Sequence, residues 1–351
     1  MRIQDTPFGA TLAESTFTDI GISLTNLSEP TAWLQGVPGA PALTQPPPHL
    51  YGDLISLAEM LRALPNDKRA DFSIRYQEQP YRGRRVMTSD GARWFVLRRV
   101  PSLRPSLNGE GSRISRLIAQ LLMGASSTPG LVLLVGQPRQ GKTYTAVSTY
   151  TATLENRGGP GVAIEDPVEF DLNGRFGEAG WGLQIDVSGT ENGYADAIKG
   201  AFRLSSSLAY IGEIRTPEVA SEVLRFAAGA FTVISTMHAA DPVQGIQRLI
   251  SLAAQRDGEA GARHLVASGV NAVVAQSMSG YPPTPQFRPL FIRTSRQFLT
   301  QDNERSIRSI IQRGELHLLE NEMRMQDNRY RTFNGQMQQA AAGAGAPQSK
   351  S

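Results

Sequence analysis

Short apolar runs recur through the second half of the chain, and segments with helical spacing separate them. Leu131–Val135 reads LVLLV, and GVAIE, LAYIG and FTVIS are three further runs of this kind. Such runs are typical of strands buried on both faces, and their alternation with helices predicts a largely parallel sheet. Thr216-Pro217 and Asp241-Pro242 each place an N-cap residue before a proline, which predicts where two of the helices begin.

A different pattern occupies the first third of the chain. Leu54, Leu57, Ala58 and Leu61 fall on one helical face. The stretches DFSIRY and GRRVMTSDGARWFVLRRV then predict strands, with a hairpin turn at Ser89-Asp90-Gly91. A helix and neighbouring strands of this kind indicate a small α+β domain.

Prolines mark the segment before this domain. Residues 29–48 contain six prolines and two glycines, a composition that argues against a helix or a central strand. We therefore expect an N-terminal appendage and linker over residues 1–49 and the α+β domain over 50–108. An amphipathic helix over Gly111–Gly124 leads into an α/β domain with C-terminal helices, over 109–335. The small, polar residues of 336–351 predict a disordered tail.

Composition narrows the class of protein. The chain has 351 residues, of which 40% are hydrophobic, and no run of about eighteen apolar residues that would span a membrane. Its first residues lack the basic and apolar segments of a secretory signal. With no cysteine and only four histidines, the chain has no disulfide or thiolate metal site, and we do not expect a structural zinc. We expect a cytoplasmic protein.

Charge is unevenly distributed, although the whole chain carries only +3. Between Arg62 and Arg116 there are thirteen Arg and Lys residues against five Asp and Glu, a net +8, so the rest of the chain carries −5. Such a block is able to bind nucleic acid or acidic lipid, or to direct arginines toward a nucleotide held by a neighbouring subunit. The block has no Lys-rich run and no interleaved stacking aromatics, so nucleic acid is the less favoured partner.

A phosphate-loop pattern follows the LVLLV strand directly. The string GQPRQGKT fits G-x-x-x-x-G-K-[ST]. Its two glycines let the backbone curl so that successive N–H groups face a phosphate at the positive end of the next helix. Lys142 is then expected to reach the β- and γ-phosphates and Thr143 to ligate Mg²⁺. The predicted nucleotide-binding residues are Gly136, Gln137, Pro138, Arg139, Gln140, Gly141, Lys142, Thr143 and Tyr144.

Acidic residues and a histidine follow the other apolar strands. Glu165 and Asp166 come after GVAI, Glu213 comes after LAYIG, and His238 closes TVISTMH. Most acids are solvated loop residues, but the carboxyl edge of a parallel sheet is where such domains bind ligands. We therefore predict that Glu165 and Glu213 are functional. His238 alone fits a loop residue or a phosphate contact equally well.

Four strings together resemble one family. VGQPRQGKT, AIEDPVEF, YIGEIRTPEVA and STMHAADPVQGIQRLI have the order and approximate spacing of the Walker A, Asp box, Walker B and His box of the secretion ATPase superfamily. These are hexameric motors of type IV pili, type II secretion, and type IV secretion or conjugation. The resemblance covers about residues 70–325. It implies an α/β fold with a RecA-like P-loop core and a smaller α+β, PAS-like N-terminal domain.

The resemblance also implies roles for individual residues. ATP and Mg²⁺ are the implied cofactors, with Glu165 orienting or deprotonating the attacking water and Glu213 supporting the metal beside Thr143. His238 would couple the γ-phosphate to domain movement. The family also supplies arginines to the active site from its N-terminal domain. The candidates here are Arg82, Arg84, Arg85 and Arg98, for which a basic surface facing the next subunit is an equal alternative.

The chain departs from the family pattern in three places. Lys199 and Arg203 align with a family Arg-x-x-x-Arg, but serines 205–207 replace the acidic, proline-bearing stretch that follows; Arg203 keeps the stronger claim to a catalytic role. Gln137–Gln140 stand where relatives favour small residues. No tetracysteine zinc module is present, which places the chain nearer to retraction motors and compact conjugation or secretion ATPases.

The combined prediction is a homohexameric ATPase that performs mechanical work in a type IV secretion, conjugation or type IV pilus system. Its expected partner is an inner-membrane platform or secretion-channel protein, which would hold it peripherally at the membrane, and no direct nucleic-acid contact is expected. The proline-rich segment and the altered loop favour conjugation or type IVB secretion over pilus retraction. A nucleic-acid motor and a non-hydrolysing scaffold are the alternatives.

Overall fold

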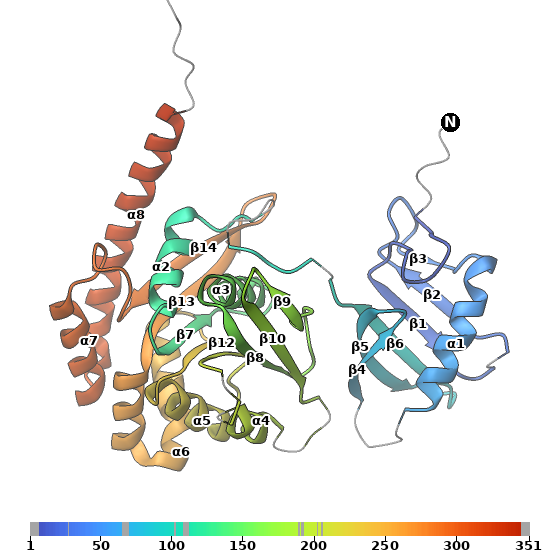
Figure 1. Ribbon diagram of the computed structural model, residues 1–351, viewed down its shortest axis with the longest axis horizontal. Coiled ribbons are helices and arrows are strands. Elements are labelled where there is room, and N and C mark those ends of the chain that lie inside the picture. The colour runs from blue at the N-terminus through green and yellow to red at the C-terminus, as the bar shows by residue number, and fades with distance from the viewer. Residues whose placement is uncertain are drawn as a thin grey trace, which may run out of the picture. The chain divides into compact units, whose positions relative to one another are not determined.

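The computed structural model describes residues 7–26, 28–64, 70–101, 103–107, 112–188, 190, 193–201, 203–204 and 206–344, with side chains as far as residue 333. The chain divides into two compact units (Figure 1). The first comprises the described residues of Met1–Leu103 with the segments Glu165–Asp171 and Asp186–Gly193. The second comprises those of Arg104–Ile164, Leu172–Ile185 and Tyr194–Ser351.

The first unit is a six-stranded antiparallel sheet with one long helix. Its strand order is β3-β2-β1-β6-β5-β4. The α-helix follows a short 3-10 turn and places the predicted Leu54, Leu57, Ala58 and Leu61 in the core. Elements of this unit are β1 (Asp19–Ser23), β2 (Ala32–Gln35), β3 (Leu43–Thr44), η1 (Pro48–Leu50), α1 (Tyr51–Arg62), β4 (Asp71–Tyr76), β5 (Gln79–Met87) and β6 (Arg93–Arg99).

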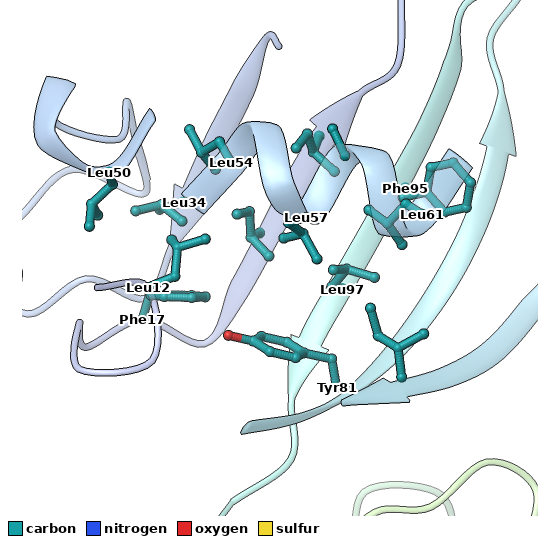
Figure 2. Close-up of a cluster of buried hydrophobic side chains, with 14 of the residues drawn as sticks. Leu12, Phe17, Leu34, Leu50, Leu54, Leu57, Leu61, Tyr81, Phe95 and Leu97 are labelled. Carbon is teal, nitrogen blue, oxygen red and sulfur yellow. The ribbon is translucent and has the colours of Figure 1, made fainter. Parts of the chain in front are cut away.

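Figure 2 shows the core of this unit beneath α1, where apolar side chains from the helix meet Phe95, Leu97 and Tyr81 from the sheet. The predicted hairpin also forms. Thr88 N–H donates to Ala92 O at 3.0 Å, and Gly91 has a φ of 81°, so the turn joins β5 to β6. The small α+β domain of the sequence interpretation is therefore a folded unit with its own core.

The prediction that residues 1–49 are an appendage and a linker is wrong, because this segment contributes strands to the sheet of the first unit. These residues form β1, β2 and β3, and β1 lies inside the sheet between β2 and β6. Ile20 and Ile22 are fully buried in the core. Proline disfavours the interior of a central strand because it has no N–H to donate, and here Pro30 and Pro38 lie on either side of β2, outside its four residues.

The second unit contains an eight-stranded sheet in the order β14-β13-β7-β12-β11-β8-β10-β9. The pairs β13·β7, β7·β12, β12·β11 and β11·β8 are parallel, and β13·β14 and β10·β9 are antiparallel. The predicted parallel sheet is thus confirmed. Its strands are β7 (Gly130–Val135), β8 (Gly159–Glu165), β9 (Gly174–Phe176), β10 (Gly180–Asp186), β11 (Leu208–Ile211), β12 (Thr232–Met237), β13 (Val270–Ser279) and β14 (Thr284–Phe291).

Two helices of this unit begin where the sequence indicated, whereas the helix predicted over Gly111–Gly124 spans Arg116–Ser126. Thr216 Oγ1 accepts a hydrogen bond from Val219 N–H, and Asp241 Oδ1 accepts one from Gln244 N–H, so both predicted N-caps form. The helices are α2 (Arg116–Ser126), α3 (Lys142–Arg157), α4 (Gly193–Ala201), α5 (Pro217–Ala228), α6 (Pro242–Gly269), α7 (Gln301–Arg313), η2 (Leu316–Leu318) and α8 (Leu319–Ala344).

The C-terminal helix continues further than expected. Residues 336–344 belong to α8, although the sequence predicted a disordered tail from 336; the remainder, 345–351, lies outside the described residues. Glutamine and alanine are strong helix formers, so this stretch can extend a helix already begun. No helix among the described residues has the length and apolar character needed to cross a membrane.

The place of β1 in the core gives a stability test. Ile20→Ala should lower the free energy of unfolding of the first unit by about 3 kcal/mol, because a fully buried side chain would leave a cavity. Leu43→Ala on the edge strand β3, where the side chain is 59% exposed, is the matched control and should change it by less than about 0.5 kcal/mol. Denaturant unfolding measures both free-energy changes. If the two changes are equally small, β1 does not contribute to the core and the segment is a linker.

Candidate nucleotide-binding site

The phosphate loop connects the fully buried strand β7 directly to α3. Gly136 has a φ of 156°, and a Cβ there would lie 2.4 Å from the carbonyl oxygen of Gln276. Gly141 has a φ of 75° and is the N-cap of α3. Only glycine meets both demands without strain. The loop therefore leads into the amino end of a sixteen-residue helix, the position at which protein backbones bind anions.

Gln140, the last of the four unusual loop residues, is tied to the neighbouring strand β13. Gln276 Nε2 donates to Gln140 O at 2.8 Å, and Met278 N–H donates to Gln140 Oε1 at 2.5 Å. Arg139 has a φ of 63°, an uncommon value for a residue with a side chain. The two bonds to β13 fix the loop next to this strained residue.

A chain of polar contacts runs from the loop to the neighbouring strands. Lys142 Nζ donates to Gln137 O at 2.8 Å and lies 3.4 Å from His238 Nδ1. His238 Nε2 is 3.2 Å from Glu213 Oε1, and Arg215 binds the other carboxylate oxygen at 2.7 Å. Lysine, histidine and acid, which the sequence placed on three separate strand ends, therefore meet in one site.

The order of the strands explains this meeting. The loop, His238, Glu213 and Glu165 follow or end β7, β12, β11 and β8, which are successive parallel strands of the sheet. Glu165 is 2% exposed, and its Oε1 accepts a hydrogen bond from Glu169 N–H at 3.2 Å. Because parallel strands end at one edge, the predicted residues share the edge where such sheets bind ligands.

The predicted metal ligands are hydroxyl and carboxylate oxygens, which suit Mg²⁺. Thr143 lies in the first turn of α3, half-buried, and Glu213 lies beyond the end of β11. Among the described residues, no group of three or more His, Cys, Asp or Glu side chains could hold a metal ion unaided. The residues fit an Mg²⁺ that takes its other ligands from phosphate and water, as nucleotide-bound magnesium does.

Three of the candidate arginines lie on the exposed face of the first unit's sheet, and the fourth does not. Arg98 is opposite Asp19 and bonds it at 2.8 Å, while Arg84 is opposite Asp71 at 3.5 Å. Arg82 has Ser73 and Arg98 as cross-strand neighbours and lies 3.5 Å from Glu169 of the same unit. Arg85 is half-buried, with its guanidinium 5.7 Å from the Phe95 ring centroid.

Lys199 and Arg203, the other basic candidates, lie at the end of α4. Lys199 Nζ is 3.8 Å from Glu222 Oε1 on α5, a long ion pair on the surface. Arg203 follows α4 in an exposed turn, in which its N–H donates to Gly200 O at 3.0 Å. Neither of these two contacts involves the phosphate loop.

Two hollows flank the phosphate loop. One of about 650 Å³ lies beside His238 and is lined by Gln137, Ala239, Ala240, Gln244, Gln247, Arg248 and Ser251. The other, of about 320 Å³, lies beside the first turn of α3 and is lined by Arg113, Ile114, Gly141, Tyr144, Thr145, Gln276, Met278, Pro283 and Pro285. The loop thus has space on both sides for the parts of a nucleotide.

Sequence reasoning did not identify Gln276, Arg215 or Arg248 as site residues. Gln276 interrupts the buried apolar run of β13, a signal of a specific polar contact. Arg215 stands two residues after Glu213. Arg248 donates to the carbonyl of His238 at 2.9 Å from α6, a contact between elements that no local pattern reveals.

Comparison with known proteins identifies the family. The family model described as "Type II/IV secretion system protein" matches residues 56–329. The type II secretion system protein E of Pseudomonas aeruginosa is 26% identical over 192 residues, which cover 54% of this chain and 37% of that protein. The chain spans less than half the length of each of the first curated relatives that it matches.

Solved structures show the same fold. The crystal structure of the pilus retraction motor PilT with bound ADP has a TM-score of 0.66 at 20% identity, covering 88% of this chain and 86% of that one. The ATPase DotB of Legionella pneumophila has a TM-score of 0.62 at 17% identity, covering 87% and 84%. These likenesses confirm the α/β fold class, a RecA-like core with a smaller N-terminal domain.

The tie between the loop and β13 can be tested directly. Gln140→Ala removes the acceptor for Met278 N–H, so amide hydrogen exchange in residues 139–142 should accelerate about fivefold, the equivalent of one ordinary hydrogen bond. Gln137→Ala, which shortens an exposed glutamine of the same loop, is the control and should leave exchange unchanged. Unaltered exchange in both variants would show that the bond does not hold the loop.

Proposed function

Because the chain belongs to the family of type II/IV secretion system proteins, we propose that it hydrolyses ATP and couples the hydrolysis to mechanical work as a homohexamer. The observation that carries the proposal is the contact chain Lys142–His238–Glu213 at the phosphate loop. A lysine, a carboxylate and a coupling histidine within hydrogen-bonding distance of one another provide what positioning and charge stabilisation of phosphoryl transfer require.

Each site residue receives a role in this proposal. The loop backbone and the amino end of α3 hold the β-phosphate, and Lys142 exchanges its bond with Gln137 O for the β- and γ-phosphates. Glu165, buried at the end of β8, orients the attacking water and accepts its proton. Thr143 and Glu213 would hold Mg²⁺, which would supply neutralising charge when bound with the nucleotide.

His238 is placed to transmit the state of the phosphates. It contacts the lysine that binds the γ-phosphate and the acid that supports the metal, so a change at either alters its partners. Its own carbonyl accepts a hydrogen bond from Arg248 on α6. Hydrolysis can therefore be conveyed from the phosphates to the first part of α6, which precedes the non-helical backbone at Gly258.

The rest of the machine is proposed from the family. The ring would act at the base of a type IV secretion, conjugation or type IV pilus system, held at the inner membrane by a platform or channel protein. The proline-rich segment does not separate these systems, because it forms strands of the N-terminal core and is not an added appendage. The proposal accordingly covers type IV secretion or conjugation systems as well as type IV pilus systems.

A nucleic-acid motor is the second candidate, and the basic face of the first unit favours it. Arg82, Arg84 and Arg98 lie together there. However, Asp19 and Asp71 pair with two of these three arginines, which lowers the positive potential below what the sequence count suggests. A non-hydrolysing scaffold is less well supported, since Glu165 and Glu213 both occupy the catalytic edge.

Nucleotide hydrolysis is tested with two variants. Lys142→Ala should lower ATP turnover at least about a hundredfold, because Lys142 is the only lysine within the loop sequence GQPRQGKT. Glu165→Gln keeps the side-chain shape, so it should bind ATP normally while losing turnover. Lys199→Ala, which removes a surface lysine, is the control. Phosphate release and equilibrium binding measure these effects, and normal hydrolysis by Lys142→Ala would end the ATPase proposal.

Substitutions of the exposed arginines of the first unit distinguish a secretion motor from a nucleic-acid motor. If Arg82 stabilises charge at the active site, Arg82→Ala should lower turnover by roughly a thousandfold, with assembly and nucleotide affinity nearly unchanged. Arg84→Ala and Arg98→Ala remove the other two arginines of the exposed face and should have smaller effects if Arg82 is the residue that acts. Turnover is measured with and without DNA at two salt concentrations. Stimulation by DNA that these variants weaken, with basal hydrolysis intact, would favour the nucleic-acid motor.

A further inference from the structure

The hollow of about 320 Å³ beside α3 has a mostly apolar surface, and its lining includes Arg113 and two buried polar side chains. Ile114, Met278, Pro283 and Pro285 supply apolar wall, and Tyr144, 38% exposed, lies among the lining residues. The buried polar members are Thr145 and Gln276, which are 1% and 4% exposed. An apolar slot with few fixed polar groups is the usual form of a small-molecule subsite.

Each of these two side chains has one polar atom that could accept or donate a further hydrogen bond. Thr145 Oγ1 and Gln276 Oε1 are buried and have no hydrogen-bond partner among the described residues. A buried polar group without a partner costs about 1–3 kcal/mol, so two of them lining one hollow call for a ligand that satisfies them.

The orientation of the Gln276 amide follows from its other contact. Its Nε2 donates to the carbonyl oxygen of Gln140 at 2.8 Å. Turning the amide over would place its oxygen against that carbonyl oxygen, which is also an acceptor. The nitrogen therefore stays with the loop, and the oxygen remains available as an acceptor.

We infer that Gln276 and Thr145 read the edge of a 6-aminopurine base, with Gln276 Oε1 accepting from the exocyclic amino group and Thr145 Oγ1 donating to an adjacent ring nitrogen. The inference rests on the proposed function as an ATPase and adds the residues that select the base. Gly141 lines the hollow and also caps α3. The base subsite therefore adjoins the phosphate subsite, as one nucleotide requires.

The chemistry of the two groups distinguishes purines. An amide oxygen needs a donor, and adenine offers one at position 6, flanked by ring nitrogens that accept. A 6-oxopurine presents an acceptor at the same position, opposite another acceptor. Purine riboside triphosphate differs from ATP only by lacking the 6-amino group, so it leaves Gln276 Oε1 unsatisfied.

The test compares equilibrium binding of ATP, purine riboside triphosphate and GTP to the full chain. The wild-type protein should bind ATP about tenfold more tightly than either of the others, as expected for one buried hydrogen bond. Gln276→Met removes the amide oxygen and should reduce the preference for ATP over purine riboside triphosphate to less than about twofold. Gln276→Glu retains an acceptor and should keep the preference.

Two further variants separate base reading from loop support. Gln140→Ala loosens the loop and should weaken ATP and purine riboside triphosphate equally, so their ratio stays unchanged. Thr145→Val removes only the hydroxyl and should weaken both about fivefold, because both bases carry the ring nitrogens. If Gln140→Ala reduces the preference for ATP over purine riboside triphosphate as much as Gln276→Met does, the effect comes from the loop. That result would overturn the inference.

The outcomes also separate this inference from the proposed function. Equal binding of ATP and purine riboside triphosphate by the wild-type protein would overturn base reading by Gln276 and leave the ATPase proposal intact. Failure to bind any of the three nucleotides would end both. If Gln276→Met does not fold, the wild-type ratio and Thr145→Val still decide the matter.

Discussion

The hydrogen bond from Gln276 to the carbonyl of Gln140 is the contact on which the candidate site depends. It joins residues 136 positions apart in the chain and holds the phosphate loop against β13, with Met278 N–H adding a second bond. Because the loop is fixed there, its backbone N–H groups are preorganised for an anion. The oxygen of the same amide lies beside the apolar hollow and has no hydrogen-bond partner in the part of the chain that the structure describes. One side chain therefore sets both the shape of the loop and the polarity of the neighbouring subsite.

The charged and polar side chains of the site contact one another in the structure. Glu213 contacts both His238 and Arg215, and Lys142 is occupied by Gln137 O and His238. A nucleotide phosphate must therefore replace existing contacts, not fill empty ones. Such exchange makes the energetic gain of binding smaller, but it ensures that phosphate arrival changes the partners of His238. This is the property that a coupling residue needs.

Local patterns predicted much of the fold and the site. The apolar runs marked β7, β8, β11 and β12, and the rule that parallel strands end at one edge placed Glu165, Glu213 and His238 together. The sequence reasoning failed where distant pairing decides the structure. Strands β1 to β3 lie in a proline-rich segment that has little strand signal of its own, and pairing of β1 with β6 brings it into the sheet. The Gln140–Gln276 bond is equally non-local, so only the polar interruption of β13 hinted at it.

In the basic first unit, the net charge counted from the sequence differs from the charge that the folded sheet exposes to a binding partner. The sequence gives +8 between Arg62 and Arg116. In the sheet, however, Arg98 pairs with Asp19, which lies outside that interval, and Arg84 pairs with Asp71. Arg85 leaves the exposed face and packs over Phe95. Arg82 has no acid beside it in the sheet and pairs only at 3.5 Å with Glu169, four residues beyond Glu165. Each of the three arginines on the exposed face therefore has a carboxylate within ion-pair distance, and strand register decides which acid that is for Arg84 and Arg98.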